Sequence, residues 1–324
     1  MTRYAFTPIL LLGCLMAACN IELEDSRDNA DNVEADGFSK VDFAYTLKYS
    51  DYFDSYINTM QYFLFDADGN YMGQLYGEDD DPSVVSLDGL TAGTYSLVGI
   101  GNLDDYATIA GLSNGLSSLS LVVSQLYDGD TANESTAASP IYANGDNIYW
   151  GQCDFTLDST STTQCFTGEL SSLHCQLLVR VVWEDLPDYS DGYAFELIGI
   201  GLQTELNNAN ATTLSYDQQF PPVSLYSGRM REDVPLRQFA LQAYLYTLRY
   251  TDDNIPTLRI LHDGEPVISD IDLAYVFDQW GWTPSSAWAQ EYQMLVTIRE
   301  DGYVELSVSV TGNVNDWENG GTLG

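Results

Sequence analysis

Residues 177–183 read Leu-Leu-Val-Arg-Val-Val-Trp, and this stretch decides the expected fold. It is dominated by apolar and β-branched residues, which favour a strand. The stretch is the core of a longer strand-like run, residues 165–183, and residues 158–164 before it are nearly all serine and threonine. We therefore place a linker at 158–164 and the start of a second domain at residue 165.

Strand patterns continue on both sides of this linker. Residues 38–49 alternate, with Val41, Phe43, Tyr45 and Leu47 on one face, and residues 66–70 (Asp-Ala-Asp-Gly-Asn) predict a hairpin turn. Further strands are expected at 57–65, 71–76, 83–87, 94–101, 193–203, 212–220, 236–250, 256–261, 290–299 and 303–311. A hairpin is expected at 142–157, around Gly145-Asp146-Asn147, and short helices at 103–112 and 272–280. This spacing predicts an all-β protein with two tandem antiparallel β-sandwich domains, residues 38–164 and 165–324.

The composition argues against a nucleic-acid partner. Of the 324 residues 45% are apolar, enough for a core in each domain, whereas acidic residues outnumber basic ones 48 to 11 and give a net charge of −37. Such a surface repels phosphate backbones, so we expect no nucleic-acid partner. Beyond the N-terminal 18 residues, no apolar run approaches the length of a membrane-spanning helix.

The N-terminus predicts a membrane anchor. Arg3 precedes a short apolar run, and residues 17–20 read Ala-Ala-Cys-Asn. This pattern resembles a bacterial lipobox, which predicts a signal peptide over residues 1–18 and a diacylglycerol with fatty acids such as palmitate on Cys19. Cys14 is an alternative with a shorter apolar segment before it, and an ordinary secretory signal is the other reading.

The residues that follow predict a disordered tether and a signal for export to the outer membrane. Residues 19–37 are acidic and have little to bury, so we expect a disordered spacer. Glu22, Glu24 and Asp25 resemble the export tag that sends some lipoproteins to the outer face of the outer membrane. The expected location is the cell outer membrane, lipid-anchored and exposed at the surface.

The cysteines and histidines do not predict catalysis. Cys153, Cys165 and Cys175 allow either one disulfide with a free thiol or three buried, reduced thiols. His174 precedes Cys175, and neighbours on a strand point to opposite faces, so they cannot form a nucleophile–base pair there. The chain has no metal-ligand spacing, and we expect no enzyme activity and no metal site.

Several segments together resemble one family, the fimbrial anchor proteins of type V pili. They are residues 62–69 (Tyr-Phe-Leu-Phe-Asp-Ala-Asp-Gly), 90–98 (Leu-Thr-Ala-Gly-Thr-Tyr-Ser-Leu-Val) with Gly101-Asn102, 290–292 (Gln-Glu-Tyr) and 314–317 (Val-Asn-Asp-Trp). The resemblance implies two transthyretin-like β-sandwiches, no enzyme activity and no cofactor. It also implies a lipoprotein that attaches a fimbrillin fibre to the outer membrane and limits its length.

The positions of the basic residues separate an anchor from a polymerising fimbrillin. A fimbrillin is activated when an arginine-specific protease removes its first strand and opens a groove for a neighbour's strand. Between Lys48 and Arg180 the chain has no Arg or Lys, and Arg27 precedes the first expected strand. A chain that keeps this strand suits a terminal anchor; the alternative is a fimbrillin-like structural or tip subunit.

Two segments are candidates for binding. Residues 303–324, with Asn315, Asp316 and Trp317, could pair with the groove of a fimbrillin, or the strand could complete its own sandwich. Trp280, Trp282 and Trp288 lie within nine residues and could stack on sugar rings in a surface carbohydrate-binding lipoprotein, or anchor a buried loop. Half of the basic residues of the mature chain lie between Arg229 and Arg259. They could form a docking patch for an acidic partner, or salt bridges to the protein's own surface.

Overall fold

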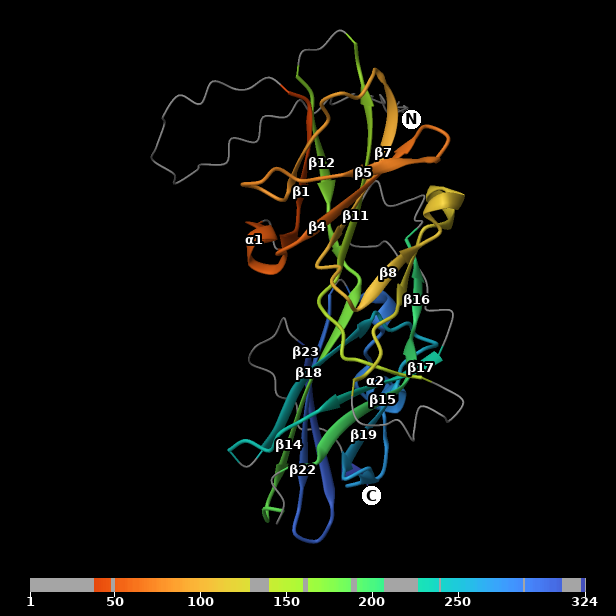
Figure 1. Ribbon diagram of the computed structural model, residues 1–324. Coiled ribbons are helices and arrows are strands. Elements are labelled where there is room, and N and C mark those ends of the chain that lie inside the picture. The colour runs from red at the N-terminus through yellow and green to blue at the C-terminus, as the bar shows by residue number, and fades with distance from the viewer. Residues whose placement is uncertain are drawn as a thin grey trace, which may run out of the picture. The chain divides into compact units, whose positions relative to one another are not determined.

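The computed structural model describes residues 38–47, 50–128, 140–159, 163–187, 191–206, 227–238, 240–287, 289–310 and 322–323, which belong to one compact unit (Figure 1). Strands dominate this part of the chain and its helices are short. The predicted all-β class is confirmed. The expected strand at 212–220 lies outside the described residues.

The N-terminal half contains two sheets that share one core. The larger is ordered β13 (Ser171–Ser172), β11 (Tyr149–Leu157), β7 (Gly93–Gly101), β4 (Met60–Asp66) and β5 (Tyr71–Leu75), and the smaller β12 (Cys165–Glu169), β1 (Lys40–Ala44) and β6 (Val84–Ser86). Apolar side chains of both sheets form a single buried cluster, including Val41 and Val85 of the smaller sheet and Leu64, Leu97 and Phe155 of the larger. The two sheets therefore pack as a sandwich.

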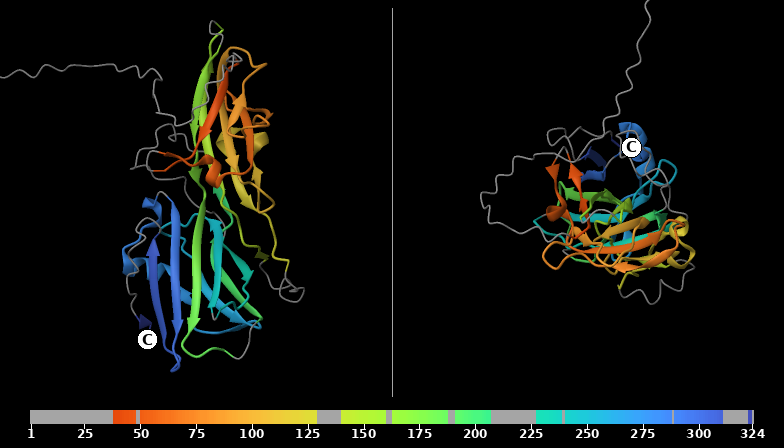
Figure 2. Two further views of the ribbon diagram at one scale, coloured as in Figure 1. Left: turned by 90° about the vertical axis from the view of Figure 1, so that its left-hand side faces the viewer. Right: turned by 90° about the horizontal axis from the view of Figure 1, so that it is seen from above.

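The C-terminal half contains a second pair of sheets. One is ordered β18 (Ala240–Leu248), β14 (His174–Trp183), β22 (Gln290–Ile298), β23 (Val304–Val310) and β24 (Thr322–Leu323). The other is ordered β10 (Ile141–Tyr142), β17 (Ser227–Asp233), β15 (Tyr193–Gly201), β19 (Thr257–His262) and β20 (Glu265–Pro266), with β21 (Ile271–Asp272) also paired to β19. On β14, Leu177, Val179 and Val181 are buried against side chains of β15, and Arg180 is exposed. Figure 2 shows the blue strands β22 and β23 beside the green strand β14.

Smaller elements complete the described chain. They are the sheet of β16 (Gln203–Glu205), β9 (Ser120–Val123) and β8 (Ala107–Ala110), the pair β2 (Thr46–Leu47) and β3 (Ser50–Asp51), the helices α1 (Phe53–Tyr56) and α2 (Leu273–Trp280), and the 3-10 turns η1 (Leu112–Asn114), η2 (Leu116–Ser118) and η3 (Pro284–Ser286).

The two expected helices had different outcomes. A helix forms at 273–280, where Asp272 Oδ1 accepts the N–H groups of Ala274 and Tyr275 at 3.0 and 3.3 Å and Gly281, in the left-handed conformation, ends the helix. The helix expected at 103–112 is wrong, because residues 107–110 pair with β9 as strand β8. Gly111, at φ 86°, then turns the chain away.

Strand pairing places the change between the two halves later than the expected boundary at residue 165. β12 pairs in parallel with β1, and β13 pairs with β11, so the last strand of the N-terminal sheets ends at Ser172 and β14 is the next strand along the chain. The halves are also interleaved, because β9 pairs with β16 and β10 pairs with β17. The pairs β1–β12, β10–β17 and β14–β22 are parallel, so the sandwiches are not purely antiparallel.

Candidate functional site

The first strand is central to its sheet. β1 pairs in parallel with β12 along its whole length and antiparallel with β6 over its first three residues. The backbone bonds extend past its ends, since the carbonyl of Ser39 accepts the N–H of Leu87 and the carbonyl of Ala44 accepts the N–H of Leu170, both at 2.8 Å. Both edges of the first strand are therefore hydrogen-bonded within the chain.

The side chains of β1 fill the slot of β1, which we define as the space between β12 and β6 that this strand occupies. Val41, Phe43 and Tyr45 are at most 2% exposed, as their alternation predicted. The ring of Phe43 lies 5.2 Å from that of Tyr62, and a Cβ placed on Gly168 of β12 would come within 2.4 Å of the Phe43 ring. Only glycine at this position leaves room for the ring, so the slot accepts another chain's strand only after β1 has left it.

Residues 303–324, the expected contact with a fimbrillin, lie partly within and partly outside the described chain. The strand at 304–310 is β23, which pairs along its length with β22 and so completes its own sheet. β24 lies at the edge of this sheet and pairs with β23 only at Val304 and Glu305. Asn315, Asp316 and Trp317 lie outside the described residues. Pairing of residues 311–324 with a fimbrillin stays a prediction.

The two described tryptophans of the expected sugar platform pack against the C-terminal core. The ring of Trp282 stacks on Tyr292 at 5.3 Å and meets Phe277 edge-on at 5.2 Å, and Trp280 is half-buried against the same cluster. This packing is what a tryptophan that anchors a loop requires. Trp288 lies outside the described residues, so sugar stacking by all three stays a prediction.

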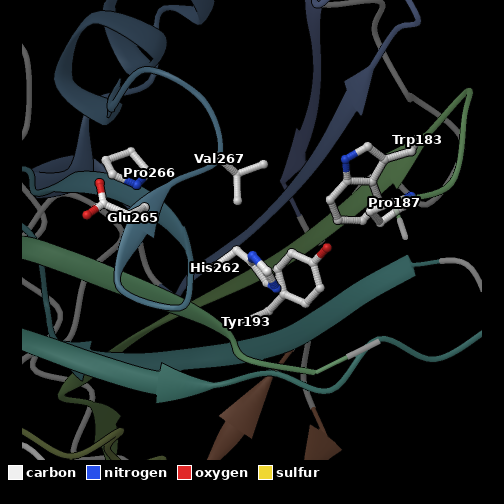
Figure 3. A pocket seen from close by; sticks show the side chains of 7 residues that line it. All are labelled: Trp183, Pro187, Tyr193, His262, Glu265, Pro266 and Val267. Carbon is white, nitrogen blue, oxygen red and sulfur yellow. The ribbon is translucent and has the colours of Figure 1, made fainter. Parts of the chain in front are cut away.

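A shallow pocket of about 270 Å³ lies in the C-terminal half (Figure 3). It is lined by Trp183, Pro187, Tyr193, His262, Glu265, Pro266 and Val267. The ring of Tyr193 lies 4.7 Å from His262 and 5.8 Å from Trp183, inclined to them by 43° and 52°. Because the rings are inclined, they present no single flat face to a sugar ring.

The expected arginine patch is largely engaged within the protein. Glu196 of β15 is buried, with its side chain 1% exposed, between Arg229 of β17 and Arg259 of β19, and ion-pairs with both; the contact to Arg259 measures 3.2 Å. Arg259 also binds Asp270 at 2.7 Å, which lowers the pKa of that carboxyl. Arg249 is buried, which lowers its pKa to about 10. These contacts favour the salt-bridged interpretation over a docking patch.

The cysteines and histidines do not form a reactive site. Cys153, Cys165 and Cys175 are all free, and Cys165 is exposed, so neither the disulfide nor three buried thiols is found. Burial raises the pKa of Cys153 to about 12 and lowers that of His174 to about 4, which leaves the thiol protonated and the imidazole neutral near pH 7. Within the described ranges, no three His, Cys, Asp or Glu residues gather as metal ligands, and none of the helices is long and apolar enough to cross a membrane.

Two of the segments that carried the family resemblance hold loops in place. The side chain of Asn102, at φ 54° and 4% exposed, accepts the N–H of Asn58 and donates to the carbonyls of Tyr56 and Asn147 at 2.8 to 3.0 Å. Gln290, 1% exposed, accepts the N–H of Tyr250 and donates to its carbonyl and that of Pro284. Sequence reasoning did not assign these roles, and the only signal was an amide side chain next to an apolar strand.

Comparisons with solved structures show a shared fold. A Bacteroides thetaiotaomicron protein, provisionally described as polysaccharide-binding, is 15% identical with a TM-score of 0.58, and the match covers 86% of this chain and 100% of that one. A Bacteroides ovatus protein, provisionally described as an adhesin, is 14% identical with a TM-score of 0.57, covering 85% and 94%. The fimbrial anchor protein Mfa2 from Porphyromonas gingivalis is 14% identical with a TM-score of 0.52, covering 85% and 97%. At these identities the likeness shows the fold alone.

The sequence itself identifies the family. No curated protein matches the chain. A family model, described as fimbrillin-A associated anchor proteins Mfa1 and Mfa2, matches residues 34–319, which is most of the chain and nearly all of its described part. The protein therefore belongs to the family of fimbrillin-A associated anchor proteins Mfa1 and Mfa2.

Proposed function

We propose that this protein is an outer-membrane lipoprotein that anchors a fimbrium to the cell surface and ends its assembly through strand-mediated contact with a fimbrillin. The observation that carries the proposal is the filled slot of β1, whose strand is hydrogen-bonded on both edges and buried through Val41, Phe43 and Tyr45. A subunit in this state cannot accept a neighbour's strand there, so a fibre that reaches it has no further place to grow.

The lipid on Cys19 supplies the attachment in this proposal. Each buried methylene contributes about 0.8 kcal/mol, so two or three acyl chains hold a protein to a membrane for long periods. The acidic residues 19–37 then form a solvated spacer between the lipid and the sandwiches. The family of fimbrial anchor proteins fits a position at the base of a fibre.

The C-terminal segment supplies the strand-mediated contact. β24 forms the edge of its sheet and pairs with β23 at only two positions, so its release breaks few backbone hydrogen bonds. Residues 311–324, including Trp317, would then be available to fill the open groove of a fimbrillin by β-augmentation. In this arrangement the anchor donates a strand and keeps its own slot closed.

The test is made in the native host with the full-length chain. Wild type is compared with Cys19→Ala and with Cys165→Ala, which removes an exposed cysteine far along the chain. We expect surface-exposed protein that retains residues 38–49 and co-purifies with a fimbrillin in wild type and Cys165→Ala. Cys19→Ala should be released from the membrane together with the fibre.

Three outcomes would contradict the proposal, in whole or in part. A mature product that begins after Lys48 would identify a polymerising subunit, because it would have lost β1. Fibre attachment that survives truncation after Thr311 would refute the C-terminal contact while leaving the lipid anchor standing. An intact surface lipoprotein with no fimbrial partner would move sugar binding to first place.

A further inference from the structure

Strand β5 is an open edge of the N-terminal sandwich. It pairs on one side with β4, from Tyr62 to Phe65, and no strand in the described part of the chain pairs with its other side. An edge strand presents unpaired N–H and C=O groups that can bind another extended chain. Residues 71–75 therefore offer a backbone surface for one further strand.

Another edge of the protein is covered in a way that β5 is not. At β18, the side chain of Asn144 donates to the carbonyl of Tyr244 and accepts the N–H of Tyr246, both at 2.8 Å, and the N–H of Gly145 donates to the carbonyl of Tyr246. These bonds occupy outward groups of β18 from Tyr244 to Tyr246, three of the nine residues of the strand. The turn η1 lies close to β5, but among the described residues no hydrogen bond comparable to those on β18 is found along the outer side of β5.

The side chains of this edge also lack the usual protection. Tyr71, Met72 and Tyr76 are 37%, 51% and 76% exposed, which places three large apolar side chains within six residues. Soluble proteins commonly guard such edges with lysine, proline, inward charges or a β-bulge. Residues 71–76 (Tyr-Met-Gly-Gln-Leu-Tyr) contain no lysine, proline or charge, and the pairing with β4 is irregular only at Met72, between Gly73 and Tyr71. Exposed aromatic and Met side chains on an unguarded edge are typical of a binding surface.

The charge around β5 specifies the chemistry of the partner. Residues 49–179 contain 18 acidic residues and no Lys or Arg. Immediately after β5, Gly77 bridges back to Val85, and Glu78, Asp79 and Asp80 are exposed at the tip of the loop, where they make no ion pair with any described residue. A carboxylate run next to an open edge attracts a cationic chain and repels an anionic one.

We propose that the outer edge of β5 is a docking site for an extended, positively charged segment of a protein partner, which joins the sheet as a further strand. A second copy of this chain is disfavoured because each copy carries a net charge of −37 before processing. The site includes neither Cys19, the slot of β1 nor the C-terminal segment, so it is independent of the proposed anchoring function.

The experiment measures binding of a fluorescent peptide that alternates valine and lysine to the mature chain, by anisotropy at low and high salt. Two control peptides replace the lysines by glutamate or place proline at the centre with the charge unchanged. We expect binding of the first peptide only, weakened by salt, together with slowed hydrogen exchange of the amides at 71–75. Equal binding of the proline peptide would overturn the proposal, because it would show attraction by charge alone.

Variants locate the site. Met72→Lys puts a positive charge on the edge and should weaken binding roughly fivefold or more, whereas Leu186→Lys, at a side chain 47% exposed in the other half, should leave it unchanged. Asp79→Asn with Asp80→Asn should weaken binding roughly 2- to 30-fold, as expected for two exposed ion pairs.

The matched control Asp185→Asn with Asp253→Asn makes the same change of charge elsewhere on the surface. An equal effect of both pairs, or exchange protection outside 71–75, would refute the site. Analytical sedimentation checks the identity of the partner. If the wild-type chain sediments as a dimer and Met72→Lys as a monomer, a second copy of the chain covers the edge, and a cationic partner is refuted.

Discussion

Truncation of the Phe43 side chain tests whether β1 is held by packing of its slot. Phe43 is 2% exposed, contacts the ring of Tyr62 and belongs to the core between the two N-terminal sheets. Phe43→Ala removes the ring and leaves a cavity, which lowers the free energy of unfolding by about 3 to 5 kcal/mol. Because single domains are stable by only about 5 to 15 kcal/mol, this loss is a large share of the total.

Gly168 provides the matched partner for a double-mutant cycle. A Cβ at this position would lie 2.4 Å from the Phe43 ring, so Gly168→Ala alone forces the ring to move and costs about 1 to 3 kcal/mol. In the double variant the new methyl group enters the space that the ring has left. We therefore expect the double variant to lose less stability than the sum of the single variants, by about 1 kcal/mol or more.

Urea unfolding monitored by fluorescence and circular dichroism measures the four stabilities. Lys40→Ala is the control on the same strand, since its ion pair with Asp42 at 2.9 Å is partly exposed and contributes at most about 1 kcal/mol. Strictly additive effects of Phe43→Ala and Gly168→Ala would refute the packing of the ring on Gly168. A loss below about 1 kcal/mol for Phe43→Ala would refute the role of this side chain in holding β1.

Three further predictions concern the C-terminal half. Glu196→Gln leaves Arg229 and Arg259 without their buried carboxylate, so urea unfolding should show a loss of about 3 to 5 kcal/mol, and a neutral effect would contradict the buried ion pair. His174 is buried and neutral with its pKa lowered to about 4, so the unfolded chain binds the extra proton and stability should fall as pH drops from about 6.5 to 4, by about 3 kcal/mol in total; His174→Gln should flatten this profile. Trp282→Ala should lower the unfolding free energy by about 2 to 4 kcal/mol through lost stacking, and an unchanged stability would favour a surface role for this ring.

Local patterns predicted much of the secondary structure. Alternation correctly assigned Val41, Phe43 and Tyr45 to the buried face of β1, because strand side chains repeat every two residues. The turn at 66–70 forms because Asp66 Oδ1 accepts the N–H groups of Asp68 and Asn70 at 2.9 and 2.8 Å, an interaction within five residues. The helix at 273–280 has its cap in its own sequence as well.

These local patterns did not predict which distant strands pair with one another. Residues 165–183 read as one strand-like run, yet its first part pairs with β1 and its last part with β18 and β22. Nothing in a strand's own residues states which distant strand will accept its hydrogen bonds. The same reason explains the wrong helix at 103–112, where pairing with β9 outweighs local preference.

The sequence by itself determined the all-β class, the acidic surface that excludes polyanions, the family and the expectation of a lipid on Cys19, because each depends on composition or on short contiguous motifs. Only the tertiary structure decided that β1 is closed in on both edges, that Gly168 makes room for Phe43 and that β5 is left open. These features arise where segments separated by up to 125 residues meet, as at Lys40 and Cys165. The free energy of that pairing lies in contacts that no single segment contains.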